Sequence, residues 1–158
     1  MVPILYGYPA SPPVRATLMT IEALGIEVEF KEINPLTPDL LKPEFLKLNP
    51  LHTIPTYQEN DFAIWNSHVI NSYLVGKYGK DDSLYPKDLQ KRAVVDQRMY
   101  FDDGILFNKL KAVAFPLASG KTKIANPDAV AELENAYTSL ETLLERSAFA
   151  AGEEITIA

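Results

Sequence analysis

Three short strings in this sequence place hydroxyl, imidazole or amide groups where a helix or a strand is expected to begin. They are Ser11-Pro12-Pro13, His52-Thr53-Ile54-Pro55 and Asn66-Ser67-His68. The start of a helix carries unpaired backbone amides and the positive end of the helix dipole, so it can stabilise an anion. These groups could therefore bind a carboxylate or stabilise a thiolate, although each string also has a purely structural interpretation.

Ser11 illustrates the two interpretations. Serine is a good N-cap and proline suits the first helical position, so the hydroxyl could simply cap the helix that begins after it. Alternatively, the hydroxyl points toward a ligand at the positive end of the dipole, where a thiolate would be stabilised. On this string alone the structural cap is favoured.

The Ile54-Pro55 pair is expected to open a strand, because proline cannot donate a ladder hydrogen bond and suits an edge or a strand start. A cis bond here would turn the backbone N–H and C=O of Ile54 outward, toward an extended peptide. The sequence alone favours the commoner trans bond.

In the third string, Ser67 is the expected N-cap, and the amides after it could hold a carboxylate instead. His52 and His68 are the only two histidines of the chain. Since no carboxylate or cysteine pattern accompanies them, we expect hydrogen-bonding surface residues and not metal ligands.

The elements that must position these strings can be predicted from hydrophobic periodicity and turn residues. The first half predicts the order β-α-β-(α)-β-β-α. A helix follows Ser11 and stops at Gly25, and another begins at Ser67. The strands are expected within residues 3–6, 27–33 and 54–65, the last range holding two strands around a turn, and a short helix within residues 34–50.

The second half shows only helical periodicity. Val95, Met99, Leu106, Leu110 and Val113 predict one long helix. Val130, Leu133, Tyr137, Leu140 and Leu144 predict a second, with Asn126 as its cap and Pro127 at its first position.

Composition restricts the class of protein. The 158 residues carry a net charge of -6, which argues against general nucleic-acid binding, and they contain no cysteine. Disulfides, thiolate metal sites and cysteine nucleophiles are thereby excluded. Neither a signal peptide nor a membrane span is predicted, so we expect a cytoplasmic protein.

In this order, the strings resemble the cytosolic glutathione transferases, and most of all the insect delta and epsilon classes, with epsilon favoured. The likeness runs from residue 3 to the end of the chain and is carried by SPPVRATL, LKPEFLKLNPLHTIPT, SHVINSYLVGKYGKDDSLYPKD and YFDDGILF. It implies a thioredoxin-like α/β domain over residues 1–79, a linker over 80–87, and an incomplete all-α domain over 88–158.

The resemblance also implies roles for single residues. Ser11 would be the catalytic residue, donating a hydrogen bond to the glutathione sulfur. Ile54 would pair its backbone with the cysteinyl part across a cis bond to Pro55, and Ser67 would take the γ-glutamyl carboxylate. The implied glutathione-binding residues are His52, Thr53, Ile54, Pro55, Asn66, Ser67 and His68. Those implied for the hydrophobic substrate are Tyr100, Phe107, Leu110, Lys111, Ala114 and Phe115.

The electrophile-binding stripe keeps an alternative explanation. Tyr100, Gly104, Phe107, Lys111 and Ala114 recur at helical spacing, and that face could equally pack against a neighbouring helix or a partner subunit.

The sequence departs from the family in three places. Asn66 stands where an acid usually faces the γ-glutamyl ammonium, and Leu40 stands where epsilon members often carry histidine. Both are expected to weaken glutathione binding. The chain also stops at EEITIA, where the family usually continues with an Asp that closes a capping box with Thr156, so we expect a fragment.

The expected function is transfer of glutathione, as co-substrate and without a cofactor or metal, to hydrophobic electrophiles by a homodimer. Dehydrochlorination or peroxide reduction could use the same thiolate. The alternative is a non-catalytic protein that binds hydrophobic ligands or glutathione, and neither nucleic acid nor membrane is an expected partner.

Overall fold

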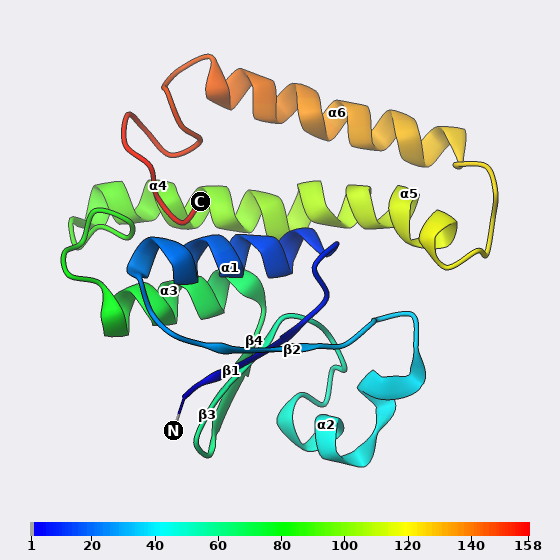
Figure 1. Ribbon diagram of the computed structural model, residues 1–158. Helices are drawn as coiled ribbons and strands as arrows, with labels where there is room; N and C mark the ends of the chain where they lie inside the picture. The colour runs from blue at the N-terminus through cyan, green and yellow to red at the C-terminus, as the bar shows by residue number, and fades with distance from the viewer. Residues whose placement is uncertain (1) are drawn as a thin grey trace. The chain divides into compact units, whose positions relative to one another are not determined.

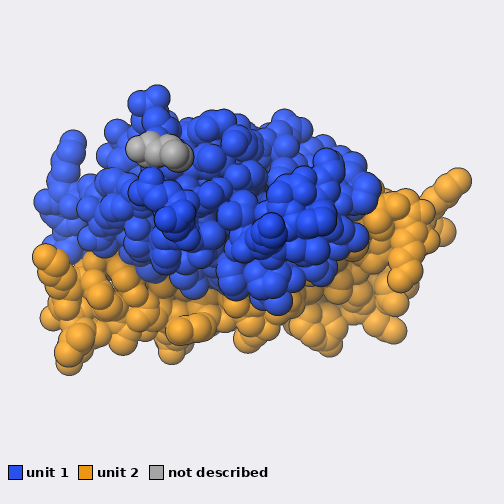
Figure 2. Space-filling view, turned by 90° about the horizontal axis from the view of Figure 1, so that it is seen from below, with its two compact units in different colours: residues 1–84, 157 blue, residues 85–156, 158 orange. Residues whose placement is uncertain are grey.

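The computed structural model describes residues 2–158, which divide into two compact units. The first unit is the chain up to Leu84 together with Ile157, and the second is Tyr85–Thr156 together with Ala158 (Figure 2). The division after Leu84 falls inside the range 80–87 that the sequence assigns to a linker.

The first unit has the mixed α/β order that the sequence predicts. Its four strands form one sheet in the order β2-β1-β3-β4, with β1 parallel to β2 and antiparallel to β3, and β3 antiparallel to β4. This is the thioredoxin-like fold that the resemblance implied. The elements are β1 Ile4–Gly7, α1 Pro12–Leu24, β2 Glu29–Glu32, the 3₁₀ turn η1 Pro38–Leu41, α2 Pro43–Leu48, β3 Thr56–Glu59, β4 Phe62–Trp65 and α3 Ser67–Tyr78.

Helices α1 and α3 pack together on one side of the sheet, and α2 lies away from them (Figure 1). The core between sheet and helices consists of Leu5, Ile21, Tyr57, Ile70 and Leu74, with exposed fractions of 9% or less. Burial of such side chains provides the main favourable free energy of folding. The core therefore holds α1 and α3 in place over the strands.

Two glycines fix the path of α1. Gly25 ends the helix in the left-handed conformation, at φ 63°, as predicted. Gly7 ends β1 where α1 crosses closely, since a Cβ atom there would lie 2.6 Å from Cγ1 of Val14. A side chain at position 7 would therefore push the helix off the strand.

Glu59, at the end of β3, ties the β3–β4 hairpin to α3. Its carboxylate accepts hydrogen bonds from the Tyr73 hydroxyl at 3.0 Å, the Tyr78 hydroxyl at 2.9 Å and Lys77 Nζ at 2.5 Å. The bond from Lys77, above all, holds the pKa of Glu59 below its usual value.

The second unit is helical, with α4 Leu89–Phe101, the π-helical segment η2 Asp102–Leu106, α5 Phe107–Ala118 and α6 Pro127–Leu144. The predicted long helix therefore exists, but a π segment interrupts it. A π segment leaves carbonyls without their α-helical partners. The Asn108 side chain donates to two such carbonyls, of Asp103 at 2.8 Å and Gly104 at 3.4 Å.

Helix α6 starts as predicted, with the Asn126 side chain accepting from the amides of Asp128 and Ala129. Its buried face agrees with the predicted stripe in part, since Val130, Leu133 and Leu140 are half-buried. Tyr137 and Leu144 are exposed, and the residue buried on α6 is Ala136. The inward face therefore lies along positions 129, 130, 133, 136, 140 and 143, where α6 packs against both α5 and η2. No helix in residues 2–158 is both long and apolar enough to cross a membrane.

Candidate active site

The three strings leave the sheet of the first unit at the same edge. Tyr6 near the end of β1 pairs with Thr56 at the start of β3, which pairs with Trp65 at the end of β4. Ser11 follows β1, Ile54 precedes β3 and Ser67 follows β4 (Figure 1). Since neighbouring strands lie about 4.8 Å apart, the topology gathers the strings within a short stretch of this edge.

Ser11 occupies the N-cap position of α1, but its side chain makes no capping hydrogen bond. The prolines explain part of this, because Pro12 and Pro13 at the first two helical positions have no N–H to donate. The backbone N–H of Ser11 is bonded to the carbonyl of Tyr8 at 2.9 Å. The hydroxyl is therefore one of very few hydrogen-bond donors that this helix end can offer a ligand.

The Ile54–Pro55 bond is cis, as the resemblance implied and against the trans bond that the sequence alone favoured. Pro55 is buried and Ile54 is half-buried, whereas His52 and Thr53 are exposed. His52 has a left-handed backbone, at φ 45°. Loop 50–55 is thus exposed at its tip and buried where it joins β3.

At the start of α3, the prediction that Ser67 caps the helix is wrong. Asn66 is the N-cap, at φ 72°, and its Oδ1 accepts from the amides of His68 at 3.0 Å and Val69 at 3.3 Å. These two amides are therefore committed to the helix itself. The hydroxyl and N–H of Ser67, which is 7% exposed, remain outside the cap as groups that could bind a carboxylate.

The structure gives structural roles to Asn66 and Leu40, the two residues that depart from the family pattern. The Asn66 amide oxygen has a structural task, because it caps α3. Leu40 is 6% exposed, so its side chain packs inside the first unit instead of facing solvent. Asn49 and Thr56, to which the sequence analysis assigned no role, are fully buried beside loop 50–55.

In the second unit, η2 separates the residues predicted for the hydrophobic substrate. Tyr100 lies in α4, before η2, and is 77% exposed. One extra residue in a helix of 3.6 residues per turn rotates all later residues by about 100°. The predicted stripe therefore changes direction at η2. The members that share α5 are Phe107, Leu110, Lys111, Ala114 and Phe115, of which Phe107 and Leu110 are half-buried.

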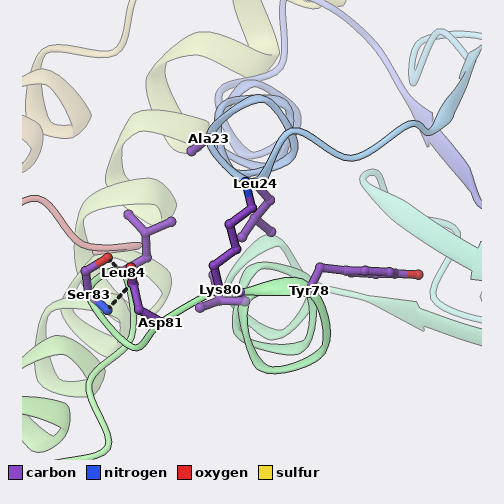
Figure 3. A pocket seen from close by; sticks show the side chains of 9 residues that line it. Ala23, Leu24, Tyr78, Lys80, Asp81, Ser83 and Leu84 are labelled. Carbon is purple, nitrogen blue, oxygen red and sulfur yellow. Dashed lines mark hydrogen bonds between the residues drawn. The ribbon is translucent and has the colours of Figure 1, made fainter.

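A cavity of about 240 Å³ lies in the first unit at the C-terminal ends of α1 and α3 (Figure 3). Ser11 and Ser67 stand at the other ends of these two helices. The polar wall of the cavity includes Lys80, Asp81 and Ser83. The Ser83 hydroxyl donates to Asp81 at 2.6 Å, and this bond lowers the pKa of that carboxyl. None of the described residues that line this cavity belongs to the three strings. Within residues 2–158, no group of His, Asp and Glu side chains could hold a metal ion.

Comparisons with known proteins agree with this geometry. Residues 5–82 match the family model described as "Glutathione S-transferase, N-terminal domain". The chain is 46% identical to glutathione S-transferase 1 of Manduca sexta, over 100% of this chain and 73% of that protein.

Solved structures are similar over nearly the whole chain. An epsilon-class glutathione S-transferase from the housefly Musca domestica has a TM-score of 0.93 and 47% identity, over 98% of this chain and 72% of its own. A glutathione transferase homolog from Drosophila mojavensis, with bound glutathione, has a TM-score of 0.94 and 42% identity, over 99% and 72%. The sequence, the fold and the site edge therefore agree, and this chain belongs to the glutathione S-transferase family, among its insect epsilon and delta members.

Proposed function

We propose that this transferase attaches glutathione to hydrophobic electrophiles, with Ser11 as the residue that stabilises the attacking thiolate. The observation that carries the proposal is the gathering of Ser11, Ile54 and Ser67 at one edge of the sheet. Glutathione is a tripeptide with a thiol, a backbone and an α-carboxylate, and the three strings offer one kind of group for each.

The thiol is assigned to Ser11. A free thiol ionises near pH 8.5, and lowering its pKa by one unit requires about 1.4 kcal/mol of preference for the thiolate. A hydrogen bond from the hydroxyl and the positive end of α1 together suit a lowering of about one to two units. Because its hydroxyl makes no capping bond, Ser11 can donate to the sulfur without cost to the helix.

The remainder of glutathione is assigned to the other two strings. The backbone of Ile54 would pair with the cysteinyl part, and the hydroxyl and N–H of Ser67 would bind the γ-glutamyl carboxylate. The residues around them complete the proposed site, and they are His52, Thr53, Pro55, Asn66 and His68.

The electrophile is assigned to α5. Phe107, Lys111, Ala114 and Phe115 share one side of this helix, with Leu110 at its border, and Tyr100 lies beyond η2. The apolar members suit a hydrophobic substrate, and the Lys111 ammonium suits a leaving group that becomes negative. Membership of the family also supports a homodimer.

The test is conjugation of glutathione to a generic aromatic electrophile. Ser11→Ala should lower turnover by about 10²-fold or more while the Kd for glutathione changes little, because the lost interaction acts on the thiolate. In Ser11→Ala, the thiolate absorbance of bound glutathione should titrate near the pKa of free glutathione. Ser83→Ala, which removes a hydroxyl from the opposite end of the same unit, is the matched control.

Two other outcomes are informative. An unchanged thiolate pKa in Ser11→Ala would remove this residue from the proposed role. Tight glutathione binding by the unsubstituted chain, without turnover of any electrophile, would favour a binding protein over an enzyme.

A further inference from the structure

The loop that joins α2 to β3 is organised around the side chain of Asn49. Asn49 and Thr56 both have exposed fractions of 0%, although they flank an exposed loop tip. A buried amide is costly unless its polar atoms are paired. The partners of Asn49 therefore indicate what its burial achieves.

Each polar atom of the Asn49 side chain bonds to this loop or to the strand after it. Nδ2 donates to the Thr53 carbonyl at 3.0 Å, to Thr53 Oγ1 at 3.0 Å and to Thr56 Oγ1 at 2.9 Å. Oδ1 accepts from the Leu51 amide at 2.9 Å. The amide is thus bonded on both sides of His52.

The backbone of Asn49 and the hydroxyl of Thr56 complete this cluster. The Asn49 carbonyl accepts from the His52 amide at 3.0 Å, and the Asn49 amide donates to the Phe45 carbonyl at 2.9 Å, which anchors the residue to α2. The Thr56 hydroxyl donates to the Thr53 carbonyl at 2.9 Å. The loop is therefore held from α2 at one end and from β3 at the other.

Loops at protein surfaces are ordinarily mobile, and a ligand that needs one loop conformation must overcome that mobility. A buried polar network with every member paired favours one arrangement over its alternatives. Here the arrangement includes the left-handed backbone of His52 and the position of Ile54 just before β3. Neither Asn49 nor Thr56 is exposed to a ligand, so any effect on binding passes through the loop.

We propose that Asn49 and Thr56 are positioning residues, which hold residues 51–55 in the shape that presents the Ile54 backbone to glutathione. The proposal rests on the proposed function, in which Ile54 pairs with the cysteinyl part of glutathione. In this proposal, Asn49 and Thr56 hold the Ile54 backbone ready to pair before glutathione binds.

The first test is a matched pair at position 56. Thr56→Val keeps the volume of the side chain but removes the hydroxyl, and Thr56→Ser keeps the hydroxyl. Calorimetric titration should give a Kd for glutathione about tenfold higher in Thr56→Val, the factor expected for the loss of one or two hydrogen bonds. Thr56→Ser should restore binding to within about twofold, and kcat at saturating glutathione should stay close to that of the unsubstituted chain.

Thr20→Val is the control for a purely structural effect. Thr20 is buried in α1 and donates its hydroxyl to the Ala16 carbonyl at 3.1 Å, so its substitution also removes a buried hydrogen bond. It should lower the melting temperature without changing the Kd for glutathione. If Thr56→Val behaves in the same way, the hydroxyl of Thr56 only stabilises the fold and the proposal is overturned.

A second variant and a second readout separate this proposal from the proposed function. Asn49→Asp keeps the acceptor for Leu51 but loses the donors to Thr53 and Thr56, and it should raise the Kd at least as much as Thr56→Val. Independently of any ligand, the amides of Leu51 and His52 should exchange hydrogen about tenfold faster in Thr56→Val. Faster exchange with no glutathione binding by the unsubstituted chain would overturn the proposed function alone. Unchanged exchange in Thr56→Val would overturn the positioning role.

Discussion

The two units hold the residues proposed for function by different means. In the first unit, short strands and a fully buried core fix the sheet edge from which Ser11, Ile54 and Ser67 depart. In the second unit, α4 buries Val95 and Met99, whereas among the described residues η2 and α5 have no buried member and α6 has only Ala136. The first unit offers backbone and hydroxyl groups held by a buried core, and the second unit offers the apolar side of α5, none of whose described residues is buried.

This difference matches the two kinds of ligand proposed for them. Glutathione is chemically constant, so groups held at fixed positions recognise it best. Hydrophobic electrophiles vary in shape, and the apolar side chains proposed to contact them lie on one helix, α5. The contrast suggests that affinity for glutathione depends on the rigidity of the first unit, whereas substrate range depends on the face of α5.

The largest expected effect contrasts the core of the first unit with helix α6 of the second. Ile70 is fully buried in the core of the first unit, and Leu140 is half-buried on α6. Ile70→Ala should lower the free energy of unfolding by about 2–5 kcal/mol, and Leu140→Ala by about 1 kcal/mol. Fluorescence of Trp65, the single tryptophan and a residue of β4, reports on the first unit, and far-ultraviolet circular dichroism reports on the helices. Equal losses would refute the contrast.

A smaller effect concerns the polar contacts of the first unit and their dependence on pH. The folded pKa of Glu59 lies below the ordinary value of 4.5, chiefly because Lys77 donates to it. The ionised carboxylate therefore stabilises the fold above about pH 4.5, and this stabilisation is lost as the pH falls through the lower folded value. Glu59→Gln should melt several degrees lower at pH 7, and the difference between the two melting temperatures should shrink as the pH falls below 4.5. A constant difference across that range would exclude this linkage.

The second unit can be examined through η2. Asn108→Ala removes the amide that bonds the carbonyls of Asp103 and Gly104, and it should cost about 1 kcal/mol of stability. Because η2 sets the rotation of α5 relative to α4, the relative rates with two electrophiles of different shape should also change. The Kd for glutathione should not change. If Asn108→Ala alters glutathione binding but not substrate preference, the assignment of glutathione to the first unit and of the electrophile to the second is wrong.

The smallest expected effect is at the border of the proposed glutathione site. Asn66→Asp keeps an oxygen that can cap α3, so stability should be preserved. The added charge should tighten glutathione by about threefold through its ammonium, and the gain should fade with added salt. Calorimetric titration at low and high salt measures both. Equal or weaker binding would mean that this side chain serves the helix cap alone.

Much of the fold could be predicted because its determinants are local. Gly25 ends α1 through its left-handed backbone, and Asn126 begins α6 through its capping side chain, so residue type alone indicates both boundaries. The strands could be predicted from short apolar or alternating runs between turn residues. For these elements, residue type and spacing were sufficient.

The prediction failed where two neighbouring residues could each cap a helix, and where the structure depends on features that apolar spacing does not reveal. Asn66 and Ser67 are both competent caps, and the left-handed backbone of Asn66 decides between them. The π segment is not detected by a pattern of 3.6 residues per turn, because it adds one residue to a helix whose apolar spacing otherwise continues. Asn49 gave only a weak signal, a polar residue followed at four and seven positions by threonines, and its burial became visible only in three dimensions.

The left-handed conformation of His52 and Asn66 has a consequence for which sequences can occupy this site. β-Branched residues meet steric conflict in that region of backbone space, whereas Gly, Asn and Asp tolerate it. In a library randomised at both codons and selected for glutathione binding, the survivors should be depleted of Val, Ile and Thr at both positions. The left-handed backbone thus limits which residues can stand at positions 52 and 66, independently of any contact between their side chains and the ligand.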